Sequence, residues 1–297
     1  MRHIIIIAII SLLPLFADED FLKGVRAEDL MVERIEPPPD SILEEVTNLG
    51  FPDYWYGKSL HSCYSLDSAF IAEARTEKPG GKVMGIWVMD IKRKTEKKIV
   101  DGIAYELKWS PSGKFLAFER MVPCKELYHG RQVYQDGGRW IYDVEANHID
   151  SLPMASYEEW SPTGDCLAGE DYSENGDWII KIYDAKTKKI TVLDQFLFFE
   201  PMNYSWSPNG EMLVYVIAQK ASGHGECSPL ESDVYVINRD GSGKTQLTHT
   251  PQPEILVKWL PDGQTIVVER FKEMPDAITG GGEKEVVVLK LKKKERK

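Results

Sequence analysis

Charged side chains recur at one position of a repeated sequence pattern, just after an apolar run that is typical of a β-strand. They could bind a polar ligand or a charged segment of another protein. The residues are Arg75, Glu119, Arg120, Glu170, Asp171, Glu269 and Arg270, and one further copy of the pattern carries Val216 and Ile217 instead. If the copies form a ring, these charges would surround one mouth of its central channel. An alternative stays open, because strand ends are often charged where they meet water, and Glu/Arg pairs can bridge neighbouring blades.

Two further segments combine cysteine with histidine, the residue types that bind zinc. One contains Cys124 and His129, and the other contains His224 and Cys227. Their spacings differ and they lie in separate copies of the repeat, which is a weak signal for a metal centre. We therefore expect no metal and no cofactor, and interpret these residues as ordinary loop residues.

The common catalytic motifs do not occur in this sequence. It contains no Gly-x-Ser-x-Gly elbow, no phosphate-binding glycine loop and no His-Glu-x-x-His pair. We expect a binding protein that is not an enzyme. The alternative is an enzyme or carbohydrate-active protein that uses the mouth of the channel, because one fold hosts many activities.

A Trp-Ser-Pro-x-Gly unit must position all of these residues. Good copies begin at Trp109, Trp160 and Trp206, an altered copy begins at Trp259, and a decayed copy begins at Tyr64. The spacings are 45, 51, 46 and 53 residues, which suits one four-stranded blade per repeat. Proline presets φ for the turn, and glycine permits a positive φ there. The pattern predicts an all-β fold, a β-propeller of four-stranded antiparallel blades, with five blades favoured and six as the alternative.

A propeller must close into a ring, because a single sheet cannot bury both of its faces. The last copy ends near Lys290 without a fourth strand. We expect the segment Asp53 to Lys58 to supply that strand by pairing with Glu285 to Leu291. The tryptophans of the repeat are expected to pack between blades, because a ligand site is seldom repeated around a ring.

The repeat, with its following Leu/Ile-Ala-Phe strand, resembles the WD40-like repeat of the TolB-type propellers of bacteria. The resemblance covers roughly residues 50–291 and implies the propeller fold. It also implies an envelope role, although the family includes peptidase propellers and other secreted proteins. TolB-type proteins carry a large α/β domain before the propeller, whereas only a short segment with Pro37 to Pro39 and a possible helix from Ser41 to Leu49 precedes the first repeat here.

The first residues have the pattern of a signal peptide. Arg2 precedes the apolar stretch Ile4 to Phe16, and cleavage is expected after Ala17. We therefore divide the chain into a signal peptide (1–17), an N-terminal extension (18–50), the propeller (51–291) and a basic tail (292–297). Retention of the signal as an anchor is the alternative. The mature protein is expected in the periplasm or outside the cell, as a monomer with no membrane-spanning segment.

Charge and cysteine content limit the partners further. The formal net charge of −11 would repel a polyanion, so nucleic acid is not expected. An envelope or secreted protein is the expected partner, and a small polar ligand is a second possibility. Disulfides are permitted outside the cytoplasm, and the three pairings of Cys63, Cys124, Cys166 and Cys227 remain open. Cys63 and Cys166 flank apolar strands and are expected to be buried thiols, which leaves Cys124 with Cys227 as the candidate bridge.

The two ends of each blade should differ in function. The Ser-Pro-x-Gly turns are short and uniform. The loops between second and third strands vary in length, and two are long, Met121 to Gly138 and Ala218 to Ser232. Variable loops on a rigid ring are common sites of recognition. We expect partner binding on this loop side and expect it to depend on the arginines there.

Overall fold

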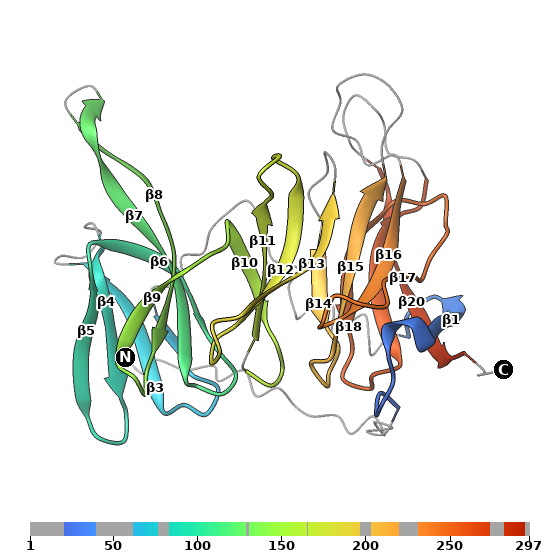
Figure 1. Ribbon diagram of the computed structural model, residues 1–297, viewed down its shortest axis with the longest axis horizontal. Helices are drawn as coiled ribbons and strands as arrows, with labels where there is room; N and C mark the ends of the chain where they lie inside the picture. The colour runs from blue at the N-terminus through green and yellow to red at the C-terminus, as the bar shows by residue number, and fades with distance from the viewer. Residues whose placement is uncertain are drawn as a thin grey trace, which may run out of the picture.

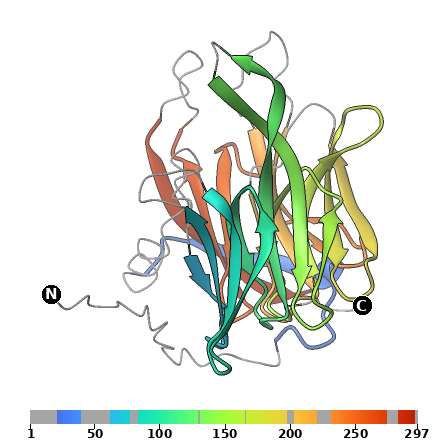
Figure 2. The same ribbon diagram turned by 90° about the vertical axis from the view of Figure 1, so that its left-hand side faces the viewer.

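A computed structural model describes residues 21–39, 62–76, 83–128, 131–164, 166–196, 203–219, 231–273 and 282–294. These residues form five four-stranded antiparallel sheets, and the expected all-β propeller with five blades is confirmed. We number these sheets 1 to 5 in chain order, and Figure 1 shows them following one another from left to right. Figure 2 shows the same sheets from the left-hand end.

The first strand of each sheet is its inner strand, and the next three follow in order toward the outer edge. Sheet 1 contains β2 (Ser62–Tyr64), β3 (Phe70–Thr76), β4 (Val83–Asp90) and β5 (Thr95–Asp101), and sheet 2 contains β6 (Ile103–Trp109), β7 (Phe115–Tyr128), β8 (Arg131–Asp143) and β9 (His148–Leu152). Sheet 3 contains β10 (Ser156–Trp160), β11 (Cys166–Tyr172), β12 (Trp178–Asp184) and β13 (Ile190–Phe196), and sheet 4 contains β14 (Asn203–Trp206), β15 (Met212–Gln219), β16 (Glu231–Asn238) and β17 (Thr245–Gln246). Sheet 5 contains β18 (Glu254–Trp259), β19 (Thr265–Phe271), β20 (Lys284–Lys293) and β1 (Leu30–Glu36).

The Ser-Pro-x-Gly unit forms the turn between the inner and second strands. In sheet 2 the N–H of Gly113 donates to the carbonyl oxygen of Ser110 at 2.9 Å, and the Ser110 hydroxyl accepts the N–H of Phe115 at 3.1 Å. Gly113 has a φ of +68°, which disfavours any residue with a Cβ. In the decayed copy Ser68 adopts a φ of +55°, and the Asp67 carboxylate accepts the Ala69 N–H. The turn therefore survives where proline and glycine are missing.

The repeated tryptophans link neighbouring sheets. The indole N–H groups of Trp109, Trp160 and Trp206 donate to carbonyl oxygens of the preceding sheet, those of Cys63 at 3.2 Å, Lys108 at 3.2 Å and Glu159 at 3.1 Å. Each acceptor comes immediately before the equivalent aromatic residue of its own repeat. The expected packing role is confirmed for these three residues. Trp259 is also buried, but its indole N–H donates to Gly263 within its own turn.

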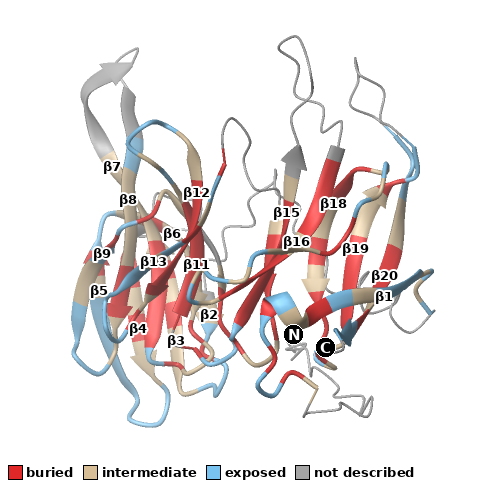
Figure 3. Cartoon of the chain, turned by 45° about the vertical axis from the view of Figure 1, so that its right-hand side comes forward, coloured by how far each residue is buried: buried red, intermediate tan, exposed pale blue. Residues whose placement is uncertain are grey.

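Apolar side chains between the sheets form the core, which Figure 3 shows as bands of buried residues along the strands. Alternate residues of each second strand face opposite neighbours, as the two-residue period of a strand requires. Leu116 and Phe118 of β7 pack toward sheet 1, and Phe115 and Ala117 pack toward sheet 3. The expected burial of Cys166 is confirmed, because 1% of this residue is exposed. Cys63 is half-buried, and burial raises the pKa of its thiol to about 12.

The last sheet is completed by a different segment from the one expected. Strand β1 pairs antiparallel with β20, from Leu30 opposite Lys293 to Glu36 opposite Val288. The closing strand therefore lies within the segment expected to be an extension, and the assignment of this role to 53–58 was wrong. Strand β20 also runs to Lys293 and takes in the first residues of the segment expected to be a basic tail.

A short segment before β1 fills the junction between sheets 4 and 5. Leu22 lies between the turn of sheet 4, where Asn209 donates to its carbonyl oxygen at 3.4 Å, and Gly263 of sheet 5. In the 3₁₀ helix η1 (Ala27–Asp29), the N–H of Ala27 donates to Asn238 at 2.9 Å. The Lys294 N–H donates to the Asp29 carbonyl oxygen at 2.7 Å, so this segment holds both sheet 4 and the end of the chain.

Several expectations fall on residues outside the described ranges. These are the signal peptide 1–17, the helix 41–49, the strand 53–58, His129, His224 and Cys227, together with the side chain of Cys124. In the described part of the chain, no helix is long and apolar enough to cross a membrane. The same residues contain no cluster of three or more potential metal ligands.

Candidate functional site

The charged residues expected at the channel mouth lie on the second strands of sheets 1, 2, 3 and 5. Arg75 is on β3, Glu119 and Arg120 on β7, Glu170 and Asp171 on β11, and Glu269 and Arg270 on β19. Their expected place on the second strands is confirmed, whereas their arrangement around one mouth of the channel stays a prediction. Most of them, however, are engaged within their own sheets.

Arg75 and Arg270 form ion pairs with acids of their own sheets. The Arg75 guanidinium lies 2.7 Å from the Glu73 carboxylate, also pairs with Glu96, and stacks 5.3 Å from the Trp87 ring centre. The Arg270 guanidinium reaches one oxygen of Glu285 through two nitrogens, at 2.9 and 2.8 Å. Because Glu96 and Glu285 belong to fourth and third strands, both guanidinium groups turn away from the inner strands.

The other charges, in sheets 2, 3 and 5, are held similarly. Arg120 lies 5.3 Å from the Trp140 ring centre and donates to the Asp101 carbonyl oxygen at 3.4 Å. The remaining pairs join residues of one sheet: Glu119 with Arg139 at 3.3 Å, Asp171 with the buried Lys181, and Glu269 with Lys284 at 3.8 Å. Glu170 is buried. Apart from the bond of Arg120 to Asp101 of sheet 1, these contacts lie within a sheet and not between blades. A recognition role for these seven residues stays a prediction.

The sequence analysis missed a carboxylate that joins three sheets at their inner strands. One oxygen of Glu159 on β10 lies 2.5 Å from Lys258 Nζ on β18, and the other accepts the backbone N–H of Trp206 on β14 at 3.1 Å. Glu159 and Lys258 each come just before the repeated aromatic of their copy, so this position faces other inner strands in these two sheets. Charged residues at that position, Lys108, Glu159 and Lys258, were the signal that could have revealed it.

A β-ribbon projects from sheet 2 on the loop side. Strand β7 pairs last with β6 at Met121, and β8 pairs with β9 no further than Arg139. Beyond these points the two strands pair only with each other, among the described residues, as far as Tyr128 opposite Arg131. Figures 1 and 2 show this ribbon rising well above its sheet. The segment Met121 to Gly138, expected as a loop, is therefore mostly strand.

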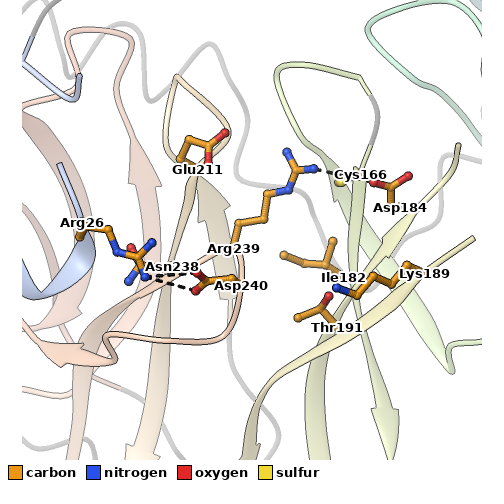
Figure 4. A pocket seen from close by; sticks show the side chains of 10 residues that line it. All are labelled: Arg26, Cys166, Ile182, Asp184, Lys189, Thr191, Glu211, Asn238, Arg239 and Asp240. Carbon is orange, nitrogen blue, oxygen red and sulfur yellow. Dashed lines mark hydrogen bonds and ion pairs between the residues drawn. The ribbon is translucent and has the colours of Figure 1, made fainter. Parts of the chain in front are cut away.

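A cavity of about 360 Å³ lies on the opposite side of the molecule, between sheets 3 and 4. Ten residues line it, and Figure 4 shows them. Sheet 3 contributes the ends of β11 to β13, sheet 4 contributes the turns that flank β15 and follow β16, and the N-terminal segment contributes Arg26. Sequence reasoning expected no site here, because it treated the turn side as uniform.

The sequence matches no protein-family model and no curated protein. Solved propellers are similar in structure at low identity. They include TolB from Acinetobacter baumannii (15% identity, TM-score 0.40, 78% of this chain and 54% of that one) and oligogalacturonate lyase from Vibrio parahaemolyticus (12%, 0.48, 77% and 64%). An acylaminoacyl peptidase from Pyrococcus horikoshii is a third (15%, 0.48, 80% and 38%). The chain spans about half of that TolB, and likeness at this level shows the β-propeller fold alone.

Proposed function

We propose that this protein is an exported binding module that holds a protein partner in the periplasm or cell envelope, and that the partner docks on the β7–β8 ribbon. The observation that carries the proposal is the length of these two strands. They contain 14 and 13 residues, whereas the second and third strands of the other sheets contain 7 to 10. The added length lies outside the body of the propeller and contributes nothing to the packing between its described sheets.

The chemistry of the ribbon favours a polypeptide as its partner. Beyond Met121 and Arg139 both of its edges carry backbone N–H and C=O groups that no other described strand pairs with. A row of such groups matches an extended peptide, which can add to the ribbon as a further strand. An isolated two-stranded ribbon is marginally stable in water, so a third strand would also stabilise it.

The proposal shifts recognition from the arginines to the ribbon. Arg75 and Arg270 are paired within their sheets, and a partner would have to displace Glu73 or Glu285 to bind them. Arg120 lies at the base of the ribbon, stacked on Trp140, and is the one of the three that a docked strand would pass. The apolar stretch Ile4 to Phe16 supports export, and the net charge of −11 disfavours nucleic acid as the partner.

A shortened ribbon tests the proposal. Val122 and Gln135 are directly opposite each other, so residues 123–134 can be replaced by Asn-Gly, which favours a two-residue hairpin turn. The body of the propeller stays intact, and the melting temperature should change little. Partner binding should fall at least tenfold, about 1.4 kcal/mol.

A photo-crosslinking residue identifies the partner and locates its docking face. At Gln135 on the ribbon it should give a specific adduct with an envelope protein, which mass spectrometry identifies. At Lys186, in the exposed turn after β12 on the opposite side, it should give none. The purified partner is then titrated against the intact and shortened proteins. Equal affinity for both, or adducts only from position 186, would overturn the proposal.

A further inference from the structure

The cavity between sheets 3 and 4 contains more hydrogen-bond donors than its own acids can satisfy. Three cations line it, Arg26, Lys189 and Arg239, together with the acids Asp184, Glu211 and Asp240. The numbers of charges are equal, but the contacts are not evenly shared. Which acids are already engaged decides what the cavity can bind.

Two of the acids are already engaged by other groups of the protein. Asp240 accepts the Ser242 N–H at 3.0 Å, contacts the Ser242 hydroxyl, and pairs with Arg26 at 3.2 Å. The hydrogen bonds from Ser242, and then Arg26, hold the pKa of Asp240 below its ordinary value. Asp184 accepts the backbone N–H groups of Lys186 at 3.0 Å and Thr187 at 2.9 Å. Both contacts are made to Oδ1 and cap the turn between β12 and β13, so this oxygen is committed to the fold.

The donors at the sheet 3 end remain open. The guanidinium of Arg239 approaches Asp184 only to 3.8 Å, beyond hydrogen-bond distance, and its side chain is 32% exposed. The ammonium of Lys189 has no partner among the described residues, and no hydrogen bond engages the Thr191 hydroxyl there. Figure 4 shows Arg239 reaching across the cavity toward sheet 3, and Lys189 beside Thr191.

The third acid lies away from Lys189. Figure 4 places Glu211 at the end of the cavity opposite Lys189, and this residue is exposed. Between the two ends the wall is apolar, because Cys166 and Ile182 line it. The cavity thus combines a cationic end, a nonpolar wall and a volume of about 360 Å³, which fits a small organic molecule.

We infer that this cavity binds a small organic anion whose carboxylate or phosphate group lies between Arg239, Lys189 and the Thr191 hydroxyl. Arginine can donate two parallel hydrogen bonds to either group, and lysine adds a point charge. The site is on the turn side, away from the ribbon, so the inference does not depend on the proposed docking function.

Three sugars with one carbon skeleton test the inference by isothermal titration calorimetry. Glucose is neutral, gluconate carries a carboxylate and glucose 6-phosphate carries a phosphate. Inorganic phosphate serves as a fourth probe that distinguishes the bare ion from an organic anion. We expect gluconate or glucose 6-phosphate to bind at least tenfold more tightly than glucose, and binding to weaken as salt rises.

Matched variants locate the binding. Arg239→Gln and Lys189→Gln should each weaken binding at least tenfold without lowering the melting temperature. Lys186→Gln removes an exposed lysine three residues from Lys189, outside the lining, and should leave binding unchanged. Absence of binding by every probe at 10 mM (about 3 kcal/mol of standard free energy), or equal binding to glucose, would overturn the inference. So would equal affinity in all variants, or tighter binding of inorganic phosphate than of both organic anions.

Discussion

The junction between sheets 4 and 5 differs sharply from the face of sheet 1 that is turned away from sheet 2. The junction is a continuous apolar cluster of β15, β16, β19 and β20, and Leu22, Val25, Ala27 and Leu30 of the N-terminal segment complete it. The face of sheet 1 carries Glu73 and Arg75, whose side chains are 38% and 35% exposed. No buried cluster of the described residues joins that face to sheet 5.

Equivalent positions of the repeat differ in burial between the two regions. Leu116, Leu167, Leu213 and Ile266 occupy one position of the second strand and are fully buried, each against the preceding sheet. Ile71 occupies the same position in sheet 1 and is only half-buried. Two places further on, Phe118, Tyr215 and Val268 are buried, whereas sheet 1 has Glu73. The repeat determines the strand, but the neighbouring sheet determines the burial.

Of the changes predicted here, removal of β20 should destabilise the protein most. Truncation after Gly282 takes away Val287, Leu289 and Leu291 from the junction and leaves β1 without its partner. The exposed edges and lost core should unfold the whole propeller, because its sheets support one another. Circular dichroism should show no cooperative thermal transition. Truncation after Lys294 is the control and should melt like the intact chain; unchanged melting of the shorter chain would disprove this role of β20.

Trp160 tests a junction of intermediate extent, between sheets 2 and 3. Its side chain packs with Phe115, at 6.2 Å between ring centres, and its N–H bonds to Lys108. Trp160→Ala should lower the free energy of unfolding by about 3–5 kcal/mol, because it leaves a large cavity. Urea titration measures this loss. A stable variant that has lost partner binding would instead indicate a role in recognition.

The equivalent isoleucines compare the two regions directly. Ile266→Ala in sheet 5 should cost about 2–4 kcal/mol, because the side chain is fully buried. Ile71→Ala in sheet 1 should cost about 1 kcal/mol, in proportion to its smaller burial. Denaturant unfolding of the two variants gives the difference. Equal losses would show that the face of sheet 1 is covered as well as the junction is.

Glu254, on β18 at the junction between sheets 4 and 5, should make the free energy of unfolding depend on pH. Burial raises the pKa of its carboxyl to about 7, against hydrogen bonds from Thr248 at 2.8 Å and Thr250 at 3.3 Å, with Asp233 and Arg270 as charged neighbours. Between its ordinary value of 4.5 and about 7, the folded protein holds a proton that the unfolded chain releases. The free energy of unfolding should therefore fall by about 3 kcal/mol as pH rises through this window.

Glu254→Gln keeps the shape of the side chain and should remove this component of the pH dependence. Glu283→Gln, at an exposed glutamate of the same sheet, is the control and should keep the wild-type profile. Chemical unfolding at pH 5, 6, 7 and 8 provides the measurement. A wild-type profile in the Glu254 variant would assign the effect to another group.

The repeat was sufficient to predict the sheets, because each Trp-Ser-Pro-x-Gly unit encodes its own turn and the strands that flank it. The closing strand had no such local signal. Leu30 to Glu36 contains three charged positions mixed with apolar ones, and only Leu30 is fully buried. Its partner Lys293 lies more than 260 residues away, so no local pattern could distinguish it from 53–58.

The candidate sites show the same contrast between positions set by the local repeat and contacts made over a long range. The positions of Arg75 and Arg270 followed from the repeat, but their partners Glu96 and Glu285 come from strands whose register depends on loop lengths. The cavity was missed because Arg26, Lys189 and Arg239 belong to three separate segments, which meet only when sheets 3 and 4 pack together.

The pairing of β1 with β20 also constrains the order in which the protein can fold. Strand β1 is synthesised before the strands of sheets 1 to 4, whereas β20 is synthesised after them. Sheets 1 to 4 are composed of consecutive strands and can assemble while synthesis continues. The fifth sheet must wait, and until then β1 is an unpaired strand open to other chains. The interval between the synthesis of the first strand and that of the last is therefore the period in which a chaperone has most to protect.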